Sequence, residues 1–140
     1  MLGRKQYSQE EIDTGRNTIR ELVESYDSLR AAVPKSRATA TAEFEAHFFN
    51  NLVLTLDRCF VHRLSGPNYE GKDGNPLNEV RIICDSLLTN GGRLRSDKQI
   101  KLPPEKSRTG LAVGEEIRLS REQFDHLADG FFAEIERRFR

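Results

Sequence analysis

The segment from Thr39 to Leu64 constrains the fold more than any other part of the chain. Wound as an α-helix, it carries large apolar side chains over more than half of its circumference, namely Phe44, Phe48, Phe49, Leu52, Val53, Leu56, Cys59, Phe60 and Leu64. A helix on the surface of a globular protein has an apolar stripe of only about 100°. A wider stripe has to be covered on several sides. Residues 39–64 are therefore predicted to form a central helix around which the other elements pack.

Amphipathic periodicity predicts three further helices, over residues 8–33, 76–89 and 120–140. Ser8 and Ser120 each precede a Glu or Gln by three residues, which is the spacing of a capping box. Asn75 is a typical N-cap residue, and Pro76 suits the first helical position because its missing N–H is not needed there.

The period of the apolar residues changes to two between residues 93 and 119, where Ile100, Leu102, Ile117 and Leu119 alternate with polar residues. This alternation predicts a small antiparallel β ribbon. The expected fold class is mostly α (α+β), with about four helices around the central helix 39–64 and the ribbon between the third and fourth helices. A chain of 140 residues fits one domain. We expect a single helical domain over residues 1–140, with a β-ribbon insertion at about 93–119.

The net charge and the hydropathy of the chain indicate which kinds of partner and which cell compartment to expect. The formal net charge is zero, so the molecule as a whole has no electrostatic preference for nucleic acid or for an anionic membrane. No apolar run approaches the roughly 20 residues that span a bilayer, and the N-terminus lacks the apolar core of a secretory signal. We therefore expect a cytoplasmic protein with no membrane partner, in which Cys59 and Cys84 are reduced.

The polar side of the central helix and the loop that follows it supply the candidate ligand-binding residues. The helix has a polar strip of His47, Asn50, Asn51, Asp57 and Arg58, and the loop 66–78 is rich in glycine, which allows close approach of a ligand to the backbone. Free N–H groups at the start of the third helix favour anions. The candidate ligand-binding residues are His47, Asn51, Arg58, Lys72 and Asn75.

Motifs for metal binding or catalysis are weak in this sequence. Glu43 and His47 share one helical face, but neither the zinc-protease pattern nor a di-metal pattern is present. Cys59 and His62 are close enough on a helix to touch, yet Cys59 lies among apolar residues, where burial disfavours the reactive thiolate. We expect no catalytic residue, no cofactor and no metal.

The predicted ribbon contains a basic segment over residues 93–108. Arg93, Arg95, Lys98 and Lys101 are its candidate nucleic-acid contacts, because basic side chains bind phosphates. No aromatic residue is interleaved with them for base stacking. Nucleic-acid binding is therefore an alternative rather than the leading interpretation.

Five stretches also carry a resemblance to a known family: FFNNLVLTLDRCFVHRL, EGKDGNPLNEVRIICDSLL, NGG, VGEEIRLS and FFAEIERRF. Together they resemble an uncharacterised family of small actinobacterial proteins over nearly the whole chain from Phe44 onward. The resemblance implies a bacterial cytoplasmic protein, and it brings no assigned activity, cofactor or functional residue.

Our leading functional interpretation is a non-enzymatic helical binding or protein-interaction module that forms a homodimer. Eight phenylalanines and several long amphipathic helices provide much apolar surface for one small domain. Phe132 and Phe139 lie toward one margin of the last helix, so we expect them to remain exposed and to form the interface, unless the ribbon covers them. The alternative is an enzyme or small-ligand-binding protein that uses the polar strip of helix 39–64 and the loop 66–78, and the second alternative is a nucleic-acid-associated factor that uses the segment 93–108.

Overall fold

The computed structural model describes residues 3–64, 69–97, 100 and 102–140. These residues contain four α-helices, which are α1 (Gln9–Ala32), α2 (Ala38–Arg58), α3 (Pro76–Thr89) and α4 (Arg121–Phe139). Two short 3-10 turns, η1 (Lys35–Arg37) and η2 (Pro104–Lys106), lie in the connections. The mostly helical class is confirmed. None of the helices combines the length and the apolar character that crossing a bilayer requires, as far as the described residues extend.

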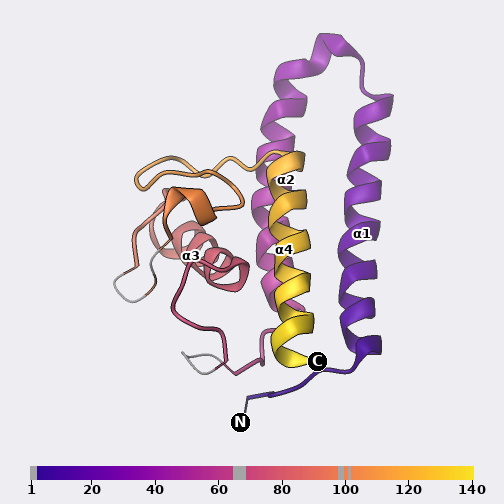
Figure 1. The fold of residues 1–140 in the computed structure, drawn as a ribbon. Coiled ribbons are helices and arrows are strands. Elements are labelled where there is room, and N and C mark those ends of the chain that lie inside the picture. The colour runs from indigo at the N-terminus through magenta and orange to yellow at the C-terminus, as the bar shows by residue number, and fades with distance from the viewer. Residues whose placement is uncertain (1–2, 65–68, 98–99, 101) are drawn as a thin grey trace.

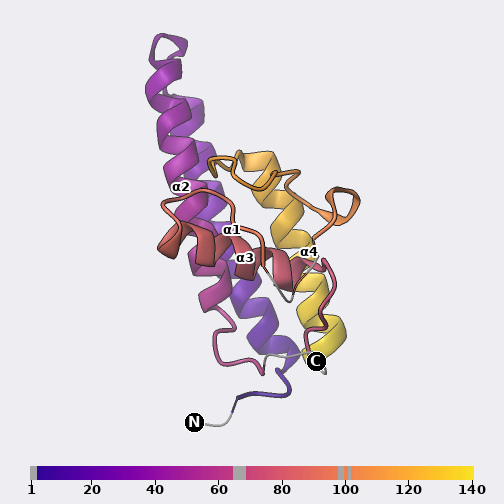
Figure 2. The ribbon, with the colours of Figure 1, turned by 90° about the vertical axis from the view of Figure 1, so that its left-hand side faces the viewer.

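Three long helices run along the molecule, and α3 lies across them. Figures 1 and 2 show α1 and α2 as an antiparallel hairpin whose tip extends beyond the start of α4. α4 contacts α1, α2 and α3. Gly130 permits the close contact between α4 and the start of α3, because a Cβ atom at this position would lie 2.8 Å from Cγ of Pro76.

The core lies where α2 meets the other helices. α2 contacts α1, α3 and α4, as expected of a central helix, and its Phe49, Val53 and Leu56 side chains are completely buried. The enclosure is incomplete toward the hairpin tip, where Phe44 is 43% exposed and Phe48 is half-buried. The apolar arc of α2 is thus wider than the surface that α1, α3 and α4 cover.

The central helix is shorter than expected, because α2 ends at Arg58 rather than at residue 64. Tight turns follow, in which the N–H groups of Phe60 and Val61 donate to carbonyls three residues back. The turns let the buried Arg63 donate to the Asp57 carboxylate at 2.9 Å and to Glu70 at 2.6 Å. A continuous helix would place residues 57 and 63 about 120° apart, on different faces. The ion pairs of Arg63 therefore require the helix to stop.

The predicted β ribbon is wrong for the described residues, which contain no sheet. One isolated antiparallel bridge joins Arg93 and Glu116, supported by hydrogen bonds from the Leu94 N–H to the Glu115 carbonyl and from the Gly114 N–H to the Leu94 carbonyl. The remaining described part of the segment consists of loops and η2. The alternating residues Ile117 and Leu119 are buried as the pattern predicts, but no strand pairs with them.

Polar side chains on the helices replace the missing strand partners. Asn50 of α2 donates to the Ile117 carbonyl at 2.7 Å and accepts from the Leu119 N–H at 3.1 Å. The buried Glu79 of α3 accepts from the N–H groups of Arg108 and Thr109 and from the Ser107 and Thr109 hydroxyls. Because buried backbone groups need partners, these side chains hold the segment against the helices without a β ladder.

The expected exposure of Phe132 and Phe139 is also wrong, since the two side chains are only 4% and 1% exposed. Gly15 of α1 lies against the Phe132 ring, and the Arg16 guanidinium lies over the same ring at 5.2 Å. The Tyr7 ring packs edge-on against Phe139. The N-terminal part of the chain, rather than residues 93–119, covers this margin of α4.

The start of α1 gives a pH-dependent prediction. Hydrogen bonds from Arg4, and then from the Ser8 N–H, lower the pKa of Glu11 from 4.5 to about 2. Because this pKa is lower in the folded state than in the unfolded state, the pair stabilises the fold above about pH 4.5, and its contribution is lost as the pH falls through about 2. We expect an NMR titration to place the Glu11 carboxyl midpoint near 2, and Arg4→Gln to raise it. A wild-type midpoint near 4.5 would contradict this contact.

Candidate functional site

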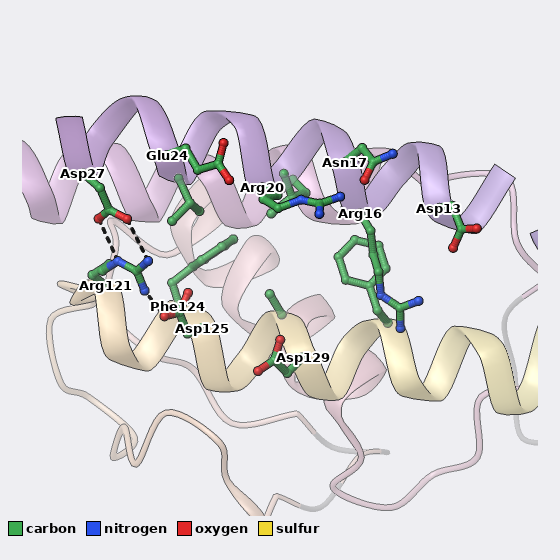
Figure 3. A pocket seen from close by; sticks show the side chains of 14 residues that line it. Asp13, Arg16, Asn17, Arg20, Glu24, Asp27, Arg121, Phe124, Asp125 and Asp129 are labelled. Atoms are coloured by element: carbon green, nitrogen blue, oxygen red, sulfur yellow. Dashed lines mark hydrogen bonds and ion pairs between the residues drawn. The ribbon is translucent and has the colours of Figure 1, made fainter. Parts of the chain in front are cut away.

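An elongated groove of about 780 Å³ runs between α1 and α4 where the two helices pack together. Its apolar floor consists of Ile19, Val23, Phe124, Ala128 and Phe132. Figure 3 shows charged side chains along both walls. Those on α1 are Asp13, Arg16, Arg20, Glu24 and Asp27, and those on α4 are Arg121, Asp125 and Asp129. Five acidic and three basic residues thus line the groove.

Arg121 anchors the end of the groove near the hairpin tip. Its guanidinium donates to both oxygens of Asp27 at 2.8 Å and also pairs with Asp125 (Figure 3). The hydrogen bond from Arg121 holds the pKa of Asp27 below its usual value. Burial raises the pKa of Asp125, and repulsion from Asp129 and Asp27 adds to this effect against the attraction of Arg121. The carboxylates of Asp27, Asp125 and Asp129 therefore repel one another even though Arg121 pairs with two of them.

Several polar groups in the middle of the groove have no partner. Arg16 pairs with Glu136. By contrast, the side chains of Asn17, Arg20, Glu24 and Asp129 form no hydrogen bond or ion pair with any residue in the described part of the chain. The partnerless charges are one cation and two anions, with the Arg20 side chain lying along α1 (Figure 3).

A second surface covers the opposite flank of α1, between α1 and α2. On α1, Thr14, Thr18, Leu22, Ser25 and Leu29 recur at three- and four-residue steps. On α2 and its C-cap, the corresponding residues are Thr41, Phe44, Phe48, Asn51, Thr55 and Cys59. We call these residues the outer hairpin face. None of them is charged, although 31% of the chain is. Charged residues, among them Arg30, Arg37 and Arg58, line hollows beside this face.

The outer hairpin face combines exposed apolar side chains with polar groups that are already hydrogen-bonded. Leu29 and Phe44 are 49% and 43% exposed beside a hollow of about 190 Å³ at the hairpin tip. The four threonine hydroxyls each donate to the backbone carbonyl four residues earlier, at 2.8 to 3.4 Å. Asn51 likewise donates to the His47 carbonyl at 2.8 Å. Burying this face would therefore leave the four threonine hydroxyls satisfied, whereas the Ser25 hydroxyl and the second N–H of Asn51 would need partners across the interface.

The five predicted ligand-binding residues lie in different environments. His47, Asn51 and Lys72 are exposed. Arg58 lines a hollow of about 620 Å³ between the N-terminal segment, α1 and the end of α2, and the other four do not line it. Asn75 is buried, where it caps α3 by accepting from the Asn78 N–H at 3.1 Å. Of the loop 66–78, residues 66–68 lie outside the described residues.

Two of the four predicted nucleic-acid contacts are described, and both are bonded within the chain. Arg93 donates to the Gly114 carbonyl at 3.1 Å, and Arg95 forms an ion pair with Asp85. Both side chains belong to exposed residues. Lys98 and Lys101 lie outside the described residues. Nucleic-acid binding by this segment stays a prediction.

The structure also shows the surroundings of residues considered for metal binding and catalysis. Within the described ranges, no group of three or more His, Cys, Asp and Glu side chains is arranged to hold a metal ion. Glu43 pairs with Arg118 at 2.8 Å. Burial raises the pKa of the Cys59 thiol, and burial raises that of Cys84 to about 12. Both cysteines are free.

The sequence contains a signal for the outer hairpin face. Thr14, Thr18 and Ser25 occur at helical spacing with Leu22 and Leu29, so one flank of the first helix lacks charge. The groove had no comparable signal. Its walls come from residues about 100 positions apart, and only the antiparallel packing of α1 and α4 brings them together.

Comparison of the chain with protein-family models, with curated proteins and with solved structures gives no match.

Proposed function

We propose that this protein is a non-enzymatic helical interaction module that acts as a cytoplasmic homodimer through the outer hairpin face. The observation that carries the proposal is the uncharged character of this face together with its exposed Leu29 and Phe44 side chains. Depletion of charge at the centre and enrichment in aromatic residues are typical of protein interfaces. Membership of the uncharacterised actinobacterial family is part of the same proposal.

A second copy of the chain fits the outer hairpin face better than a charged partner does. In a two-fold dimer each copy presents the same surface, so an uncharged face meets another uncharged face. From Thr14 to Leu29 the face extends about 22 Å at 1.5 Å per residue. It is two helices wide, so two copies in contact would form a four-helix arrangement.

The free energy for association would come from the exposed apolar side chains. Half-buried Leu22 and Phe48 lie beside Leu29 and Phe44 on the face. Burying apolar surface contributes about 25 cal/mol per Å² before the costs of association are subtracted. The internally bonded threonine hydroxyls add little favourable energy, but they also impose no penalty.

Sedimentation equilibrium at micromolar concentration tests the proposal. We expect a species of 32 kDa, which is twice the chain mass of 16.0 kDa. Leu29→Glu combined with Phe44→Glu should give a folded monomer of 16.0 kDa, because it places two negative charges in the interface. Far-UV circular dichroism checks that the helices remain.

A matched control separates a specific interface from a general effect of added charge. Leu88 and Val113 are 70% and 67% exposed and lie outside the outer hairpin face. Leu88→Glu combined with Val113→Glu should therefore leave the dimer intact. A monomeric wild-type protein would refute the dimer, and equal dissociation by both double variants would refute this interface.

A further inference from the structure

We propose that the groove between α1 and α4 binds an amphipathic helix with basic flanks, supplied by a protein partner. This inference goes beyond the homodimer, because the groove uses other residues. The groove residues Asp13, Arg20 and Glu24 and the outer hairpin face lie on different flanks of α1. A dimer would thus keep one open groove on each copy.

The shape of the groove favours a helix. Its wall on α1 extends from Asp13 to Asp27, which corresponds to about 21 Å, or the length of a 14-residue helix. Two packed helices form a surface on which a third can lie with its side chains between theirs. This is the helix-in-groove mode of peptide recognition.

The floor specifies small residues on the partner. Ile19, Val23 and Ala128 are only 4%, 8% and 6% exposed, so the floor is shallow and already packed. Large apolar side chains would hold a partner helix away from it. Alanine at the contacting positions would let the backbone approach closely.

The walls specify the charge of the partner. Glu24 and Asp129 have no partner in the described part of the chain, and Asp13 accepts only from Gln9 at 2.9 Å. The lining as a whole has five acidic residues against three arginines. Arg20 is the one partnerless cation of this lining in the described part of the chain, so the unpaired groups are still predominantly acidic. Lysine or arginine side chains on both flanks of a docked helix would therefore find carboxylates on both walls, whereas an acidic helix would meet more repulsion than attraction.

The test uses a synthetic 14-residue helical peptide with alanine along one stripe and lysine on both flanks. Methyl NMR of the full-length protein should show saturable shifts for Ile19 and Val23, and affinity should weaken with added salt. Glu24→Gln combined with Asp129→Asn should weaken binding about fivefold to tenfold, since it removes two exposed ion pairs with the peptide.

Two controls make the result decisive. Glu21→Gln with Glu122→Gln removes one exposed carboxylate from each of the same two helices, away from the groove, and should leave the affinity unchanged. A peptide with glutamate in place of lysine should not bind. The proposal is overturned by an absence of shifts at millimolar peptide, by equal binding of both peptides, or by equal losses in the two double variants. None of these results depends on whether the protein dimerises.

Discussion

Replacing Leu52 by alanine is expected to lower the free energy of unfolding by about 2–5 kcal/mol, through lost apolar transfer and the cavity left behind. Leu52 lies on α2, which contacts each of the other three helices, and it is only 4% exposed. Phe49→Ala should destabilise at least as much. Its ring is completely buried, and the ring centroid lies 4.8 Å from that of Tyr26 of α1 and 5.3 Å from that of Phe124 of α4.

Leu88→Ala is the matched control for this measurement. It removes the same atoms from a residue that is 70% exposed, so urea denaturation should show a change within about 0.5 kcal/mol. If Leu52→Ala also changed the stability by less than about 0.5 kcal/mol, α2 would not be the centre of the core.

Arg63→Met is expected to destabilise the fold by about 3–5 kcal/mol, because it removes a buried guanidinium from Glu70 and Asp57 and leaves the buried Glu70 carboxylate with only the partly exposed Arg81. The Arg63 and Glu70 side chains are 2% and 3% exposed, with Nε of Arg63 donating to Glu70 at 2.6 Å. The same guanidinium donates to the Phe60 carbonyl at 3.0 Å and to Asp57 at 2.9 Å. One side chain thus holds the turns after α2 in place.

The second arginine on Glu70 provides the comparison. Arg81 donates to both Glu70 oxygens at 2.7 Å but is 42% exposed, so Arg81→Met should destabilise by at most about 1 kcal/mol. Combining Arg63→Met with Glu70→Leu should recover much of the lost stability, because it removes the buried carboxylate as well. Equal losses for Arg63→Met and Arg81→Met in thermal and urea melts would contradict the difference in burial.

The helix starts could be predicted from the sequence because capping is local. The side chains of Ser8, Asn75 and Ser120 accept from the N–H group three residues ahead, as their neighbours in sequence indicate. The end of α2 could not be predicted in this way. The helix ends so that the Arg63 side chain can donate to Glu70. Because Glu70 lies outside residues 39–64, the apolar periodicity of that segment carries no information about this bond.

Apolar alternation predicted burial correctly and pairing incorrectly. Ile117 and Leu119 are buried, but their backbone groups bond to Asn50, which lies almost 70 residues earlier in α2. The same limit applies to Phe132, which is covered by Gly15 and Arg16 from the other end of the chain. The apolar pattern of a segment therefore does not show whether its backbone will bond to a strand or to a side chain on a helix.

The two candidate surfaces also differ in whether the sequence alone could reveal them. The uncharged flank of α1 is a property of one helix, and Thr18, Leu22 and Ser25 show it in the sequence alone. The groove depends on two helices. Glu24 and Asp129 become neighbours across one groove only after α1 and α4 pack antiparallel, so their shared environment has no counterpart in local sequence.

The most direct measurement of the central claim is an isotope-filtered NOE experiment on a sample that mixes isotope-labelled and unlabelled chains. If two copies associate through the outer hairpin face, the labelled methyl groups of Leu22 and Leu29 will show intermolecular NOEs to the ring protons of unlabelled Phe44 or Phe48. If these NOEs are absent, or if the intermolecular contacts instead involve Leu88 and Val113, the outer hairpin face is not the interface.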